Sequence, residues 1–232
     1  DLFGMNAAGT DAKMRNTKES ILEAQFTSGA GNWCTWMFGR DLVNWNNNFT
    51  WAKWVTPSRD LISAFKQEGD EVRFKESIVY YDCNWSNYYP SDNYPFMYKC
   101  RSANSSIIKY RYADVLLLKA EALIMQDTPD LEGAADIIDE VRDRAKLGAL
   151  PTSVRSNKNV LLNALLKERR LELAFEGQRW FDLVRLDKVE EVMNAVYSKD
   201  SGRKAQIYTF DKNSYRLPIP QSVIDANDKI HQ

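Results

Sequence analysis

Apolar residues recur at helical spacing through the second half of the chain. The pattern predicts a helix over about 112–123, where alanines alternate with leucines, and another over about 131–147. Between them, the segment 127–130 contains Pro129 and is predicted to be a short turn. Two helices joined in this way form a helical hairpin of tetratricopeptide-like size, although no strict 34-residue period repeats along the chain.

Two further helices are expected after this hairpin. One covers about 158–176 and begins at an N-cap residue, either Ser156 or Asn157. The next covers about 178–186, with a continuation through Val196. The pattern therefore predicts a helical scaffold for the C-terminal half of the chain.

The first half begins with a polar, glycine-containing stretch. Ile21, Leu22 and Phe26 predict an extended segment that packs through these side chains. A helix is then predicted from Thr56, as the N-cap residue before Pro57, with its apolar residues inward until Gly69 ends it.

Two stretches fit neither a helix nor a strand. Residues 32–54 and 80–98 combine Trp, Tyr and Phe with Asn, Asp and Ser, and their apolar positions follow neither period 2 nor period 3.6. Five of the seven tryptophans fall between residues 33 and 54. Both stretches are predicted to be aromatic loops.

The predicted helix over 158–176 carries charges on its apolar side. At 3.6 residues per turn, Arg169 and Glu176 fall on the same side as four leucines, Leu162, Leu165, Leu166 and Leu173. An unpaired buried charge costs several kcal/mol, so each needs a partner. The candidates are each other or the neighbouring cations Arg142, Arg144 and Arg179. Gly177 is predicted to end this helix as a C′ glycine.

Composition limits the possible functions. The chain has 232 residues, of which 44% are hydrophobic, so it can bury a sizeable core. Its 31 basic and 32 acidic residues leave no net field to hold nucleic acid or an anionic membrane. No apolar run approaches 18 residues, and no signal peptide or lipid-accepting N-terminal cysteine is seen, so we expect any targeting segment to lie outside this chain. Cys34, Cys83 and Cys100 allow at most one disulfide and lack zinc-site spacing.

Catalysis has weak support in this sequence. The only histidine is His231, and no metal-binding spacing or cofactor motif occurs, so no cofactor is expected. Glu168, Glu172 and Glu176 could offer a pair of glycosidase carboxylates, which would have to be exposed and roughly 5 to 10 Å apart. Because each has an arginine within about one turn, structural ion pairing is the favoured interpretation.

Four segments resemble one known family. ERRLELAFEGQRWFDLVR at 168–185 resembles the signature of the SusD/RagB-type outer-membrane nutrient-binding lipoproteins, and RYADVLLLKAEAL at 111–123 also resembles that family. So do ESILEAQF at 19–26 and LPIP at 217–220. The resemblance runs from about residue 19 to about 227 and corresponds to the C-terminal half of a family member.

The resemblance implies a non-enzymatic function. Family members capture a nutrient, most often an oligosaccharide, at the bacterial surface, as outer-membrane lipoproteins that serve a SusC-type TonB-dependent transporter. It further implies that the helices form the scaffold and the loops face the glycan. Residues 1–106 are accordingly expected to be the loop-rich, ligand-facing part of a single region, and 107–232 its helical scaffold.

The aromatic loops provide the candidate glycan site. Sugar rings stack on flat aromatic side chains, while amides, carboxylates and guanidinium groups bind their hydroxyls. Trp180 and Phe181 are assigned to the core instead. The candidate glycan-binding residues are Trp33, Trp36, Arg40, Asp41, Asn44, Trp45, Asn46, Trp51, Tyr81, Trp85, Tyr88 and Tyr89.

The predicted fold is mainly α, a helical-hairpin scaffold with long aromatic loops. Two other functions stay open, a helical-repeat scaffold that binds only protein and, with less support, a glycan-cleaving enzyme. The hairpin at 112–147 is apolar on more than one side, since residues 115–118 are all aliphatic. One face of it is therefore expected to need a neighbour, so the chain would self-associate or pair with an N-terminal companion.

Overall fold

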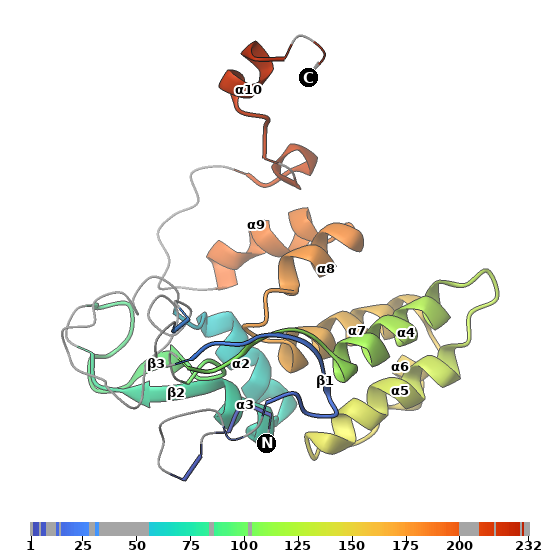
Figure 1. The fold of residues 1–232 in the computed structure, drawn as a ribbon. Helices are drawn as coiled ribbons and strands as arrows, with labels where there is room; N and C mark the ends of the chain where they lie inside the picture. Colours follow the sequence, from blue (N-terminus) through green and yellow to red (C-terminus); the bar gives the residue numbers. More distant parts are fainter. Residues whose placement is uncertain are drawn as a thin grey trace. The chain divides into compact units, whose positions relative to one another are not determined.

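A computed structural model shows the fold of the chain (Figure 1). It describes residues 2–4, 6–7, 13, 15–27, 31–32, 56–83, 86–101, 104–199, 209–215, 217–227 and 229. The chain divides into two units, residues 1–179 and 180–232. The described elements are mostly helices, which confirms the predicted mainly α class.

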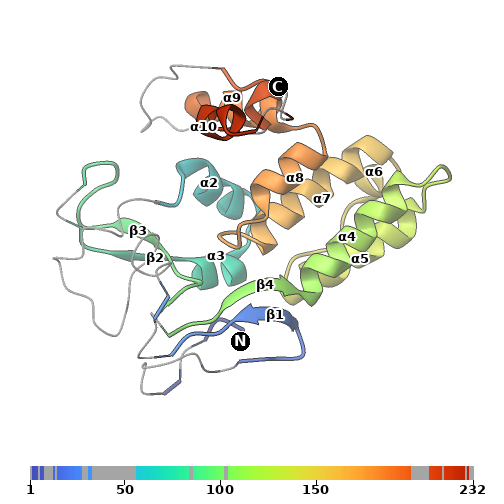
Figure 2. The same cartoon turned by 45° about the horizontal axis from the view of Figure 1, so that its top comes forward.

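Four helices form the scaffold of the first unit. They are α4 (Tyr112–Met125), α5 (Leu131–Arg144), α6 (Thr152–Arg155) and α7 (Lys158–Glu172). The long helices α4, α5 and α7 lie side by side in both views (Figures 1 and 2). Leu117, Ile138 and Leu165 each contribute a fully buried side chain to the core between them. The predicted hairpin is thus confirmed.

Residues within 1–106, the part predicted to be loop-rich and ligand-facing, also form regular structure. Helix α2 (Arg59–Glu68) is followed by α3 (Glu71–Ser77), and the antiparallel strands β2 (Ile78–Tyr81) and β3 (Tyr94–Met97) form a hairpin. A second core, which includes Phe65, joins α2 and β2 to the end of α7. The prediction that 80–98 is entirely loop is therefore wrong, because its ends pair with each other.

A second strand pair is formed by β1 (Ser20–Ala24) and β4 (Ile107–Arg111), which run antiparallel. The predicted extended segment at 19–26 is confirmed, but its packing is not. Ile21 and Leu22 are 58% and 52% exposed, since backbone pairing with β4 rather than burial holds the strand.

Three predicted helix boundaries are corrected. Ser58, rather than Thr56, caps α2, because its hydroxyl accepts the Leu61 amide proton. Helix α7 does begin after Asn157, but it ends at Glu172 and Gly177 lies beyond its cap. The predicted helix over 178–196 is two helices, α8 (Arg179–Arg185) and α9 (Val189–Lys199), separated where Asp187 adopts a φ of 53°.

The second unit contains most of α8, then α9, the 3-10 helix η2 (Lys212–Tyr215) and α10 (Gln221–Asp225). The Asn194 side chain on α9 donates a hydrogen bond to the Phe210 carbonyl and accepts one from the Phe210 amide, which links α9 to the segment before η2. Phe181 is 65% exposed, so its assignment to the core is wrong. Among the described residues, no helix combines the length and apolar character that crossing a membrane requires.

Candidate functional site

A groove lies between α2 and the β2–β3 hairpin. Residues at positions i, i+3, i+4 and i+7 of α2 form one wall, because this spacing keeps side chains on one side of a helix. The hairpin supplies the other wall, and the groove holds about 340 Å³. Its lining residues are Arg59, Ile62, Ser63, Lys66, Tyr80, Tyr89, Pro90 and Asn93.

Cation–π contacts, edge-on ring contacts and hydrogen bonds hold the hairpin against the start of α2. The Arg59 guanidinium lies 4.2 Å from the centre of the Tyr88 ring and 4.3 Å from that of Tyr89, and it donates to the Tyr88 carbonyl. The Tyr89 hydroxyl donates to the Pro57 carbonyl at 2.7 Å. Tyr89 also packs edge-on against Tyr94. These contacts fix the orientation of the groove's aromatic wall.

Tyr80 and Lys66 give the groove its remaining chemistry. Partial burial raises the pKa of Tyr80, so its hydroxyl stays protonated at neutral pH and can donate a hydrogen bond. Lys66 is exposed, and no ion pair holds its ammonium group within the described part of the chain. Ser63 and Asn93 add polar groups beside the rings. The groove thus combines aromatic faces with hydrogen-bonding groups.

The predicted site residues are only partly placed by this structure. Tyr81, Tyr88 and Tyr89 are all half-buried. Tyr89 lines the groove and Tyr88 contacts Arg59. Tyr81 instead packs edge-on against Phe96, with 6.5 Å between the two ring centres. Nine predicted residues lie outside the described part of the chain: Trp33, Trp36, Arg40, Asp41, Asn44, Trp45, Asn46, Trp51 and Trp85.

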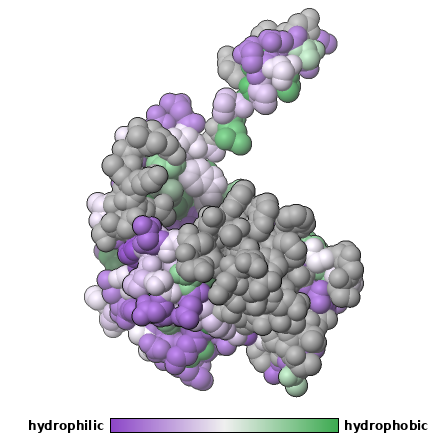
Figure 3. Space-filling view, turned by 90° about the vertical axis from the view of Figure 1, so that its left-hand side faces the viewer, coloured by the Kyte–Doolittle hydropathy of each residue, from purple (hydrophilic) through white to green (hydrophobic). Residues whose placement is uncertain are grey.

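Sequence reasoning missed most of the groove. It did not propose Arg59, Ser63, Lys66, Tyr80 or Asn93 as ligand-facing. The α2 wall could have been found from its i, i+3, i+4, i+7 spacing, since these positions lie on one side of a helix. On the face seen in Figure 3, the described surface is mostly hydrophilic, with apolar atoms in small patches.

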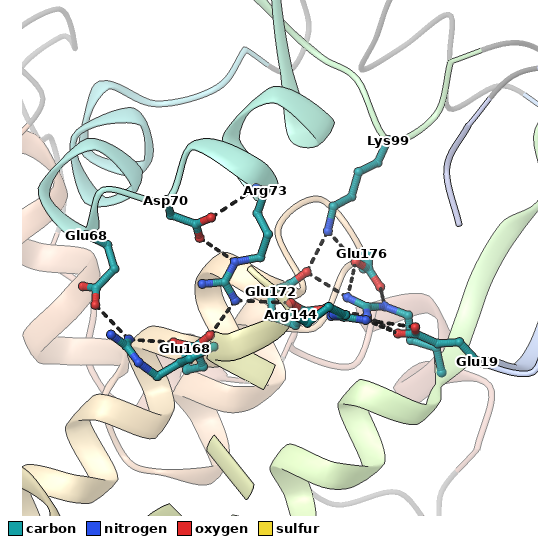
Figure 4. A network of polar contacts seen from close by, with 11 residues as sticks. Glu19, Glu68, Asp70, Arg73, Lys99, Arg144, Glu168, Glu172 and Glu176 are labelled. Carbon is teal, nitrogen blue, oxygen red and sulfur yellow. Dashed lines mark hydrogen bonds and ion pairs between the residues drawn. The ribbon is translucent and has the colours of Figure 1, made fainter. Parts of the chain in front are cut away.

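A dense ion-pair network joins α3 and α7 (Figure 4). Arg73 of α3 contacts Asp70 and Glu168 at 2.5 Å each and Glu172 at 3.2 Å. Glu176 lies between Lys99, at 2.6 Å, and Arg111, at 2.7 Å. The remaining members are Glu19, Glu68, Arg142 and Arg144.

The predicted partners of the two buried charges, Arg169 and Glu176, are wrong. Arg169 and Glu176 are both paired, as expected, but neither pairs with the other. Arg169 contacts Asp114 of α4 at 2.8 Å, while Glu176 contacts Lys99 and Arg111. The candidate partners Arg142 and Arg144 instead bind carboxylates that include Glu168 and Glu172, and Arg179 donates to the Leu166 carbonyl.

The carboxylates of the network form ion pairs with its cations. Burial alone would raise the pKa of Glu172, but the charges of Arg111 and Arg144 outweigh it and hold this pKa well below its ordinary value. The pKa of Glu176 is lowered against burial by Lys99 and Arg111. Burial raises the pKa of Glu168 despite its arginine partners. We assign these groups to ion pairing rather than to acid–base chemistry.

A hollow of about 430 Å³ adjoins this network. Among its lining residues, Arg73, Arg111 and Glu172 already take part in the ion pairs described above. It therefore offers less unpaired polar chemistry to a ligand than the groove does. In the described part of the chain, no cluster of three or more His, Cys, Asp or Glu could hold a metal ion.

Comparison with known proteins places the chain in a family. The sequence profile of the SusD family matches residues 91–232. Two SusD-like proteins of Formosa agariphila are 43% identical over 99 residues and 35% identical over 136 residues. The aligned regions cover 40% and 56% of this chain, and 19% and 26% of the relatives.

Solved structures share the fold at lower identity. A SusD homolog from Bacteroides thetaiotaomicron superposes with a TM-score of 0.68 at 20% identity, over 92% of this chain and 51% of that one. Surface glycan-binding protein A from Bacteroides uniformis gives 0.65 at 22%, over 94% and 49%. A laminarin-binding SusD-like protein gives 0.61 at 24%, over 91% and 49%. The chain thus spans about half the length of these structures.

Proposed function

The chain belongs to the SusD family, and from this premise we propose that it binds an oligosaccharide at the bacterial cell surface without cleaving it. Two proteins that share its fold are described as glycan-binding and as laminarin-binding. Within the proposal, the bound sugar is delivered to a SusC-type TonB-dependent transporter in the outer membrane, and the full-length protein is lipid-anchored there.

The aromatic groove is the observation that carries this proposal. Its walls hold Tyr80 and Tyr89, whose rings suit the flat C–H faces of a sugar. Ser63, Asn93 and the Tyr80 hydroxyl supply hydrogen-bonding groups for sugar hydroxyls. At about 340 Å³, the groove falls at the lower end of small-molecule sites, roughly 300–1,000 Å³, so it suits a short segment of a glycan. We propose that the nine undescribed residues of the predicted site extend it.

Binding without cleavage is supported by the state of the carboxylates. A glycosidase needs two carboxyl groups free to face the scissile bond. Glu168, Glu172 and Glu176 are instead buried or half-buried, and each contacts a cation. The groove itself has no Asp or Glu among its described lining residues.

A glycan array probed with the protein tests this proposal, followed by calorimetry on any oligosaccharide that binds. Combined replacement of Trp45, Trp51 and Trp85 by alanine should abolish binding while leaving far-UV circular dichroism unchanged. Tyr80→Ala should weaken binding up to about tenfold, because a stacked aromatic contact contributes roughly 0.5–1.5 kcal/mol.

Tyr110→Ala is the matched control for the groove, since Tyr110 is an exposed tyrosine of β4 that does not line it. Unchanged affinity in both the triple variant and Tyr80→Ala would contradict the proposal. Release of shorter products from a bound oligosaccharide would instead show the chain to be an enzyme.

A further inference from the structure

The charges around the groove point to a narrower class of sugar. Arg59 and Lys66 both line it, and the described lining contains no carboxylate. They are seven residues apart on α2, which places them about 10 Å apart along the helix axis. The groove is therefore flanked by a cation at each end, although the whole chain carries a formal charge of only −1.

The acidic residues of α2 that are closest in sequence to these two positions pair with cations outside the groove. Asp60, beside Arg59 on α2, pairs with Arg170 of α7 at 2.6 Å. Glu68, near Lys66 on the same helix, pairs with Arg142 at 2.8 Å and with Lys167. Both carboxylates are thus directed toward other cations and not toward the groove.

The two cations are suited to different tasks. Arg59 is held between the Tyr88 and Tyr89 rings, so its guanidinium is preorganised and loses little freedom when a ligand binds. Lys66 is exposed at the other end of the lined face and can approach an anion as a mobile point charge. An ammonium without an ion pair, beside aromatic rings that stack on sugar, suits a sugar that carries a negative group.

We infer that this groove binds an anionic oligosaccharide, with Lys66 paired to a carboxylate or sulfate ester on a sugar that stacks against Tyr80 and Tyr89. The inference rests on the proposed function and specifies its ligand. The shared chemistry is an oxyanion on a sugar ring, and matched probes distinguish its two sources.

The experiment compares pairs of probes with the same sugar backbone, one charged and one neutral. Oligogalacturonate is compared with its methyl ester, and a sulfated galactan oligosaccharide with its desulfated form, by calorimetry on the intact chain. We expect the charged member of one pair to bind about tenfold tighter at low salt. This preference should largely disappear at 1 M salt, where the screening length is about 3 Å. Preference within the first pair identifies a uronic acid, and preference within the second a sulfate ester.

Lys66→Gln locates the effect, and Lys75→Gln is its matched control. Both lysines lie in the last turn of a helix, but only Lys66 lines the groove. Lys66→Gln should weaken binding of the preferred charged probe up to about fivefold and leave its neutral counterpart unchanged. Lys75→Gln should change neither.

The results distinguish failure of this inference from failure of the proposed function. Equal binding of charged and neutral probes, or equal effects of the two lysine substitutions, overturns the inference while leaving oligosaccharide binding in place. Absence of binding to every oligosaccharide, neutral or charged, overturns the proposed function together with the inference.

Discussion

Glu176 lies on the apolar side of its sequence pattern and is bound by two cations, Lys99 and Arg111. The sequence pattern predicts that this charge is buried and paired, and it is, although α7 ends at Glu172 and a turn rather than the helix positions Glu176. The partners could not be predicted, since they lie 77 and 65 residues earlier in the chain and reach Glu176 only through the tertiary fold. Local pattern therefore predicts which charges need partners, and only the fold identifies them.

Replacing Glu176 tests the network at the level of one residue. Glu176→Gln should lower the free energy of unfolding by roughly 3–5 kcal/mol, because two buried cations lose their shared carboxylate. Urea unfolding measures the loss, with Glu71→Gln as the control, since the Glu71 side chain is 69% exposed and its pair with Lys75 contributes little. Equal unfolding midpoints for the two variants would show that the Glu176 pair is not a structural requirement.

The same network should make stability depend on acid pH. The pKa values of Glu172 and Glu176 are lower in the folded chain than the ordinary 4.5, so their stabilising effect is present above that pH and is lost as the pH falls below it. The raised pKa of Glu168 acts in the opposite direction, but it is one group against three, since the pKa of Glu68 is lowered as well. The free energy of unfolding in urea should therefore decrease from pH 6 to pH 3. A flat or rising profile would contradict this prediction.

At the scale of single elements, helix positions were predicted more accurately than helix ends. The end of α2 at Gly69 follows from local chemistry and is observed, and of the two predicted N-cap residues of α7, Ser156 and Asn157, the structure has Asn157. Helix α7 ends four residues earlier than expected, where the chain turns and Phe175 adopts a φ of 66°. The turn brings Glu176 to its cations, a tertiary requirement that sequence periodicity does not contain.

Gly177 tests this turn. Its φ of 83° disfavours any side chain, although nothing lies within 4 Å of an added Cβ. Gly177→Ala should therefore destabilise the chain by about 1–2 kcal/mol through backbone strain alone. Gly148→Ala is the matched control, because its surroundings are equally open and its φ is not in the left-handed region. Thermal unfolding measures both variants, and equal melting temperatures would show that the turn tolerates a side chain.

At the scale of the whole molecule, the helical scaffold was predictable and the groove was not. Helices α4, α5 and α7 follow from a 3.6-residue pattern that each carries in its own sequence. The groove instead joins α2 to Tyr80, Tyr89 and Asn93, which depend on how β2 and β3 pair. Aromatic density drew attention to residues 80–98, some of which line the groove, but the second wall of the groove required the tertiary fold.

That one face of the hairpin needs a neighbour stays a prediction, and it is supported by exposed apolar residues of α4. Tyr112, Val115, Leu118 and Met125 recur at helical spacing, and each is between 40% and 54% exposed. Leu117, between them in sequence, is fully buried, so the helix is apolar on two sides. A set of exposed apolar residues on one helix, here called the α4 stripe, is typical of a surface that packs against another protein surface.

We predict that the isolated chain self-associates through this stripe. Sedimentation should show mass that rises with concentration, together with binding of a hydrophobic dye. Val115→Lys combined with Leu118→Lys should reduce both, because two charges would then have to be buried in the contact. Leu217→Lys is the control, since Leu217 is 94% exposed but lies outside the stripe. A wild-type chain that sediments as a compact monomer and binds no dye would show that the α4 stripe needs no covering partner.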